Sequence, residues 1–192
     1  TGRQPNGDLL EVDRAGIAVD ERGYVTTDSH LRTTAEGVWA LGDVTNPRQL
    51  KHTANAEARI VAHNLTDPDD LRSVDRRFTP HAVFGHPQIG SVGYTEQQLM
   101  DVGRPYLVAT RHYSDTAYGW AMEDTTGFAK VLADPDTRLL LGAHIVGPQA
   151  PTLIQQLIQG MAAGLTVDRM ARDQLYIHPA MPELVEQALL DL

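Results

Sequence analysis

A histidine and a carboxylate near the C-terminus have the types and the spacing of an acid–base pair. His178 and Glu183 flank a short segment that contains two prolines, Pro179 and Pro182. The prolines restrict the backbone, so we expect His178 in an extended or turn segment and a closing helix over residues 182–190. A carboxylate in the first turn of that helix can hold one imidazole nitrogen and leave the other free to exchange protons with a substrate. The same glutamate also fits a purely structural role, because a negative charge there complements the helix dipole.

Composition excludes several other classes of chemistry. The chain has 192 residues, of which 42% are hydrophobic, and this is enough for one large or two small domains with a buried core. Lys and Arg number 16 against 25 Asp and Glu and are scattered singly, which argues against a nucleic-acid partner. No apolar run is long enough for a membrane span or a signal peptide, so a cytoplasmic location is expected. The chain has no Cys, which excludes a disulfide scaffold, a thiolate zinc site and redox chemistry by its own sulfur.

A second candidate site follows an apolar run in the N-terminal part. Residues 38–41 have the composition of a buried strand in a parallel sheet, and Gly42 and Asp43 come directly after it. Ligands of open α/β sheets bind beyond the carboxyl ends of strands, so Asp43 could receive a sugar-like hydroxyl, although a simple turn is the alternative. A helix is predicted over residues 51–65, and its positive N-terminal end, at Lys51, could face negative charge on a ligand.

The chain divides into an N-terminal part of short strands and a C-terminal part of mixed elements. A charged segment without apolar periodicity, residues 66–77, predicts the boundary. Short strands over residues 16–20 and 24–27, joined by a tight turn, are expected before it. After it we expect a capping box at Thr95 and Gln98, a second at Thr152 and Gln155, and a hairpin turn at residues 134–137. The predicted strands cover residues 83–84, 91–93, 107–113, 128–133 and 139–146, and the predicted helices cover residues 95–102, 152–164 and 167–172. This pattern predicts an α+β domain with helices on one face of an antiparallel sheet.

Four motifs in order resemble one enzyme family. They are the Gly-Arg-x-Pro-Asn start, the Thr-x-x-x-Val-Trp-Ala-Leu-Gly-Asp segment, PQIGSVGYTE at residues 87–96 and the His-Pro-x-x-x-Glu ending. Together they resemble the C-terminal portion of the flavin-dependent pyridine nucleotide–disulfide oxidoreductases. The segments LKHTANAEARIVAHNL, AYGWAMED and IHPAMPELVEQALL are most similar to the subfamily that reduces mycothione, the disulfide of mycothiol.

The resemblance implies a fold, two cofactors and a partner. Residues 1–77 would be an α/β remnant of the FAD- and NAD-binding region, and residues 78–192 an α+β interface domain that makes a homodimer. Asp43, with Gly42, would bind the ribityl chain of FAD, and the helix end at Lys51 and His52 would face the pyrimidine end of the flavin. NADPH would be the reductant.

By the same resemblance, the pair near the C-terminus would be the family's general acid–base pair. His178 and Glu183 would protonate a leaving thiolate and would act across the subunit interface on the redox disulfide of the partner. The family's Gly-rich FAD fingerprint, its Cys pair and its nucleotide domain are not in these 192 residues. We therefore expect a fragment that binds FAD weakly or not at all and is inactive alone.

Several alternatives stay open at this point. The chain could be a stable dimerisation module without chemistry, or part of another family member such as glutathione or dihydrolipoamide reductase. A metal-dependent hydrolase would need His81, His86, His144 and His178 to converge, but no known ligand spacing is present, so no metal is predicted. Tyr118 and Trp120 could contact substrate or pack in a dimer interface. Trp39 is expected in the core, and His112 and His144 are expected to be structural, hydrogen-bonded histidines.

Overall fold

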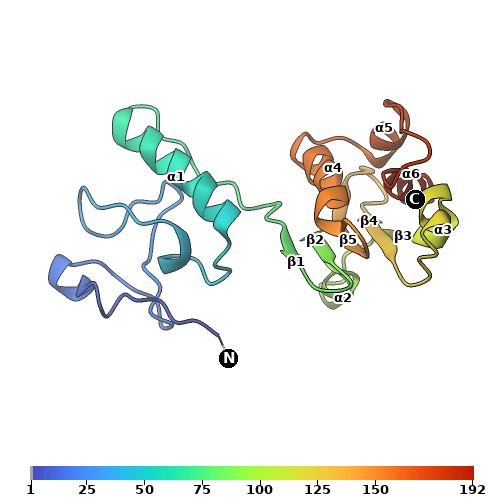
Figure 1. Ribbon diagram of the computed structural model, residues 1–192. Helices are drawn as coiled ribbons and strands as arrows, with labels where there is room; N and C mark the ends of the chain where they lie inside the picture. Colours follow the sequence, from blue (N-terminus) through green and yellow to red (C-terminus); the bar gives the residue numbers. More distant parts are fainter. Residues whose placement is uncertain (1) are drawn as a thin grey trace. The chain divides into compact units, whose positions relative to one another are not determined.

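The computed structural model describes residues 2–192, and the chain forms two compact units. Contacts divide it into Thr1–Arg76 and Arg77–Leu192 (Figure 1). The division falls at the end of the charged segment over residues 66–77. Each unit has its own set of buried apolar side chains, so each is described separately.

The N-terminal unit is built around one long helix. Helix α1 (Lys51–Thr66) packs on the 3-10 turn η2 (Gly42–Val44), and a second 3-10 turn, η1 (Val12–Ala15), lies earlier in the chain. The predicted helix over residues 51–65 is therefore confirmed. Gly23 has a positive φ of 85° in the turn between the two predicted short strands, where a side chain would be disfavoured. The strands themselves are reduced to one isolated bridge, Val19 with Val25.

The buried parallel strand predicted over residues 38–41 is wrong. Its only ladder contact is an isolated antiparallel bridge between Arg32 and Trp39. Val38 is 37% exposed, and Trp39 is half-buried and lines an open pocket with Thr26 and Asp28 instead of lying in the core. A buried strand needs a neighbour on each side, and the described residues of this unit form no strand beside it.

The C-terminal unit contains an antiparallel sheet of five strands, as predicted. The strands are β1 (His81–Val83), β2 (Ile89–Gly93), β3 (Leu107–His112), β4 (Phe128–Ala133) and β5 (Leu140–Val146). Their order is β1-β2-β5-β4-β3, and every pairing is antiparallel. Residues 134–137 join β4 and β5 as the predicted hairpin turn. All strand ends agree with the prediction to within two residues, and β1 ends one residue before the exposed Phe84.

Helices cover one face of this sheet fully and the other face in part. Helix α4 (Ala150–Ala162) packs on β2 and β5, and α6 (Glu183–Leu190) packs on β3, β4 and α5 (Val167–Arg172) (Figure 1). Their buried leucines and the sheet form the main core. The short helix α2 (Glu96–Asp101) lies over the opposite face, where Leu99 packs with Leu132 and Leu141. The prediction of helices on one face only is thus incomplete, because α2 covers part of the second.

One of the two capping boxes predicted from the sequence is present, and the other is not. Thr95 caps α2, and Gln98 completes the capping box, as predicted. The box predicted at Thr152 is wrong, since α4 begins two residues earlier, after Gln149 in a left-handed conformation. Pro151 fits the first turn of a helix, where no amide donor is needed, so α4 extends past Thr152 toward the N-terminus. Helix α6 begins at Glu183, with Pro182 as its N-cap.

A bilayer crossing requires a long apolar helix, and none of the helices formed by residues 2–192 meets that requirement.

Candidate functional site

The structure brings His178 and Glu183 together in the geometry expected for an acid–base pair. His178 Nδ1 lies 2.7 Å from Glu183 Oε1, and the other carboxylate oxygen accepts a hydrogen bond from the Ala180 amide at 3.0 Å. The side chain of Glu183 is only 12% exposed, whereas that of His178 is 70% exposed. The carboxylate is therefore fixed inside the turn, and the imidazole it holds faces solvent.

The surroundings of Glu183 favour its charged form. The hydrogen bond from His178, followed by the one from the Ala180 amide, lowers the pKa of the Glu183 carboxyl below its ordinary value. An ionised carboxylate only accepts hydrogen bonds, so Nδ1 of His178 must carry the proton between them. In the neutral imidazole Nε2 is then the basic nitrogen, and Glu183 can balance the charge when Nε2 takes up a proton.

An open cavity adjoins the imidazole. It has a volume of about 490 Å³ and is lined by His178, Pro179 and residues of the turn η3 (Tyr113–Asp115) and the short helix α3 (Ala117–Ala121). Tyr118 and Trp120 are the two aromatic side chains in its lining. A molecule in this cavity would lie beside the exposed imidazole.

The second predicted site, at Gly42 and Asp43, is held in place by Glu57, which the sequence did not indicate. The amide of Gly42 donates to Oε2 of Glu57 at 2.7 Å, and Arg76 Nη2 donates to the other oxygen at 2.7 Å. Glu57 is fully buried on α1, so it ties the turn at residue 42 to the helix. A glutamate within a helix gives no sequence signal for this role. Gly42 itself has a φ of 74°, and a Cβ there would lie 3.4 Å from the Ala54 side chain.

The predicted ligand-binding residues lie around this junction. Asp43 is 52% exposed and forms a long ion pair, 3.7 Å, with Arg3. Lys51 and His52 are exposed at the first turn of α1, and Lys51 Nζ donates to Asn55 at 2.8 Å. The structure therefore places Gly42 against α1, whereas Asp43 pairs with Arg3 and Lys51 bonds to Asn55.

The N-terminus of α1 has unused hydrogen-bonding capacity that suits a bound ligand. No side chain caps this end of the helix. Thr53, in the same turn, is 8% exposed, and its hydroxyl has no hydrogen-bond partner among the described residues. Buried polar groups are rarely left without a partner, so a missing ligand edge is a physical reason for the orphaned hydroxyl. Amide donors at a helix start suit an electron-rich edge with oxygen acceptors, as in a flavin pyrimidine. Sequence reasoning did not single out Thr53, because the type of residue does not reveal an unsatisfied hydroxyl.

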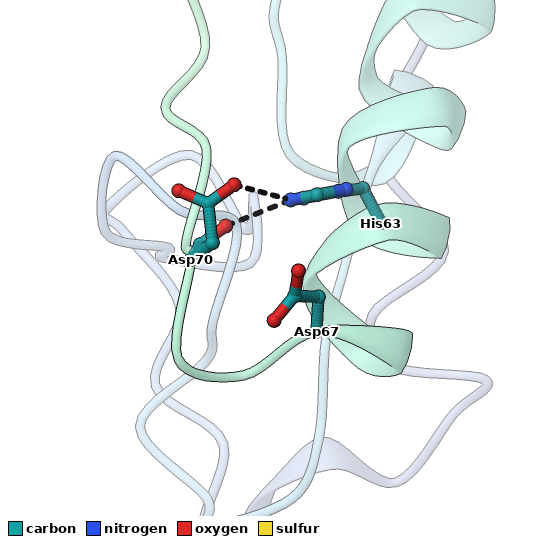
Figure 2. Close-up of side chains that lie close together, drawn as sticks. All are labelled: His63, Asp67 and Asp70. Atoms are coloured by element: carbon teal, nitrogen blue, oxygen red, sulfur yellow. Dashed lines mark hydrogen bonds and ion pairs between the residues drawn. The ribbon is translucent and has the colours of Figure 1, made fainter.

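The histidines of the hydrolase alternative do not gather into a site. The cluster of potential metal ligands within residues 2–192 is a different one, His63, Asp67 and Asp70 (Figure 2). There His63 Nε2 lies 2.7 Å from the Asp70 carbonyl oxygen, so this nitrogen acts as a donor and offers no lone pair to a metal. His144 is bound on both sides, by Ser91 Oγ at 2.6 Å and by the Tyr94 carbonyl at 2.9 Å. Its structural role is confirmed, and burial lowers its pKa.

Comparison with known proteins identifies the family. The family model for the pyridine nucleotide-disulphide oxidoreductase dimerisation domain matches residues 79–189. A second family model, for pyridine nucleotide-disulphide oxidoreductases, matches residues 1–59. The chain belongs to the pyridine nucleotide–disulfide oxidoreductases. The family resemblance drawn from the four sequence motifs is thereby confirmed.

Individual relatives are similar over the whole chain. Mycothione reductase of Mycobacterium tuberculosis (strain H37Rv) is 53% identical over 100% of the chain, and dihydrolipoyl dehydrogenase of Corynebacterium glutamicum is 34% identical over 97%. The solved structure of a HOCl-induced flavoprotein disulfide reductase from Escherichia coli superimposes with a TM-score of 0.88 at 34% identity and covers 99% of the chain. The chain spans 42%, 40% and 43% of these three proteins, respectively. Activity, substrate and partners of a whole enzyme are therefore proposals for this chain.

Proposed function

We propose that this chain is the acid–base and dimer-forming portion of a mycothione reductase. The observation that carries the proposal is the His178–Glu183 pair, 2.7 Å apart, with the carboxylate shielded and the imidazole exposed. The identity of 53% to a mycothione reductase over the full chain supports this substrate over the disulfides of glutathione and dihydrolipoamide.

The pair would act as a proton donor during disulfide cleavage. When a thiolate attacks the disulfide substrate, it forms a new bond to one sulfur, the bond between the two substrate sulfurs breaks, and the other sulfur leaves as a thiolate. Nε2 of His178, in its protonated form, gives that thiolate a proton, and Glu183 balances the charge of the imidazolium. The chain contains no Cys, so the attacking thiol must come from outside these residues. We assign it to the partner subunit, so that the pair works across the dimer interface.

The proposal includes two cofactors, of which only the flavin has candidate residues in this chain. Bound FAD would supply electron transfer from NADPH to the redox disulfide. Gly42 and Asp43 would hold its ribityl chain, and the first turn of α1, with Lys51, His52 and the orphaned Thr53 hydroxyl, would face its pyrimidine edge. The residues that would bind adenine and pyrophosphate are not among these 192, so the chain by itself would hold FAD weakly. A cytoplasmic location is also part of the proposal.

The test is the kinetics of the full-length reductase that carries this chain. Replacing the imidazole in His178→Ala should lower kcat for mycothione by about 10²- to 10⁴-fold, because general acid–base catalysis typically contributes that much. Reduction of the bound flavin by NADPH, followed by flavin absorbance, should keep its wild-type rate because it does not need this proton. His63→Ala, a histidine in the last turn of α1 and outside the pair, is the matched control. A His178→Ala enzyme with near wild-type turnover would refute the proposal.

The chain alone provides a second test. With added FAD, NADPH and mycothione it should show no steady loss of nicotinamide absorbance, because no thiol is present to attack the disulfide. Sustained turnover by the 192 residues would contradict the assigned role. The same inactivity is expected of a dimerisation module without chemistry, so only the His178→Ala result separates these two functions.

A further inference from the structure

We propose that Tyr118 and Trp120 form a binding surface for a neutral, sugar-like part of the disulfide substrate, directly beside His178. This inference rests on the proposed function and assigns substrate recognition to residues that the catalytic pair does not include. Both aromatic side chains line the cavity that His178 and Pro179 also line. A disulfide whose sulfur lies at the imidazole would therefore bring its adjoining group against α3.

Helix α3, which carries the two aromatic residues, is held in place by Tyr113 and Thr116. The Thr116 hydroxyl donates to the Tyr113 carbonyl at 2.9 Å and accepts from the Gly119 amide at 3.2 Å. Tyr113 is fully buried, and its own hydroxyl donates to the Pro148 carbonyl at 2.7 Å. A Cβ at Gly119 would lie only 2.0 Å from the Tyr113 oxygen, so α3 sits directly on that carbonyl. Such a support fixes side chains in place before a ligand arrives.

The aromatic side chains nevertheless face solvent. Trp120 is 74% exposed and Tyr118 is 40% exposed, although their supports Tyr113 and Thr116 are almost completely buried. Large exposed aromatic groups in the lining of a cavity are typical of recognition surfaces, because they provide contact area with few rotatable bonds. Their exposure leaves both aromatic faces free to contact a bound molecule.

The charge of the lining indicates which substrates the cavity suits. Apart from the titratable His178, its only ionisable carboxylate or amine is Asp115, and it contains no Lys or Arg. A thiol peptide with free carboxylates would find no cation there and would meet a negative charge. A sugar ring can place its C–H face on an aromatic ring and its hydroxyls on Asp115 and Ser114. Mycothione carries sugar rings, so the cavity chemistry and the proposed substrate agree.

Kinetics of the full-length reductase test this assignment. In Trp120→Ala the ratio of kcat/KM for mycothione to kcat/KM for a small disulfide without sugars, hydroxyethyl disulfide, should fall about tenfold, the loss typical of a good stacking contact. Trp120→Phe should retain most of the ratio, because it keeps an aromatic face. Met122→Ala, an exposed side chain just after α3 that does not line the cavity, is the matched control. Ala121→Arg, which adds a cation to the lining, should raise kcat/KM for oxidised glutathione.

A binding measurement separates this inference from the proposed function. The 192 residues contain two tryptophans, so in the isolated chain Trp39→Phe leaves Trp120 as the only tryptophan fluorophore. Reduced mycothiol should then change the Trp120 emission, even if the enzyme does not turn mycothione over. An inactive wild type together with this change would refute the proposed function alone. An equal loss for both disulfides in Trp120→Ala, with no change in emission, would overturn the sugar subsite and indicate a subunit contact instead.

Discussion

Glu183 is held by two hydrogen bonds, and both favour its ionised form. His178 and the Ala180 amide lie at 2.7 and 3.0 Å from its two oxygens, so its pKa in the folded chain is below the unfolded value. The stability it contributes is therefore complete above its ordinary pKa of 4.5 and is lost as the pH falls through the lower folded value. The same carboxylate thus links the proposed catalysis to stability.

Glu183→Gln should lower the free energy of unfolding by about 1 kcal/mol at pH 7, since His178 is exposed and water screens the pair. The difference from wild type should shrink as the pH falls below 4.5 and the wild-type carboxylate becomes protonated. Denaturant unfolding of the chain at a series of pH values measures both effects. Glu186→Gln, which makes the same change at another glutamate in the first turn of α6, is the control. A loss of equal size at pH 7 and at pH 2 would exclude the charged pair as its cause.

At the residue scale, the sequence predicted the reactive types but not the groups that hold them. The prolines and the helix start predicted a turn at His178 and a first-turn position for Glu183, and the structure pairs the two side chains there. Thr53 and Glu57 were missed because burial and an orphaned hydroxyl depend on neighbours distant in the chain. Gly42 was chosen for its place after an apolar run, yet its observed partner is Glu57, fifteen positions later.

At the scale of elements, local chemistry predicted helices and hairpins well and failed where a partner element was needed. The apolar periodicity of α4 and the turn between β4 and β5 are local signals, and both elements formed. The apolar run at residues 38–41 has the same local composition as a buried strand, but the described part of the unit gives it no sheet to join. The two predicted helix caps, of which one is present and the other is not, allow a test of where these helices begin.

Thr95→Ala should destabilise the chain by about 1 kcal/mol, because it removes the oxygen that accepts from the Gln98 amide at the start of α2. Thr152→Ala should change stability by less than about 0.5 kcal/mol, since α4 begins at Ala150 and Thr152 is exposed in its first turn. Thermal or denaturant unfolding of the two variants measures the difference. Equal losses would mean that Thr152 also caps its helix, as the sequence alone predicted.

At the scale of the whole molecule, one face of the sheet has no cover of its own at one end. Val83, Ile89, Val146, Phe128 and His112 are paired across all five strands and so form a single row on one face, here called the cross-strand row. Val83 is 52% exposed and Ile89 is 37% exposed, whereas the opposite face is buried under α4 and α6. Four of the five residues in the row are apolar, and an apolar row that faces solvent is typical of an interface. The match to a dimerisation domain supports a second copy of this chain as its partner.

Ile89→Asp should therefore weaken the proposed homodimer by on the order of 2 kcal/mol or more, because the interface would bury an unpaired charge. The fold should persist, since Ile89 faces away from the core under α4 and α6. Sedimentation analysis at micromolar concentration should show a dimer for the wild type and a monomer for the variant. Val102→Asp, which changes a more exposed apolar side chain after α2 and outside the row, should remain dimeric. If Ile89→Asp also remained a dimer, the interface would have to lie on another surface. If the pair at His178 acts across the interface, the monomeric variant of the full-length enzyme should also lose turnover.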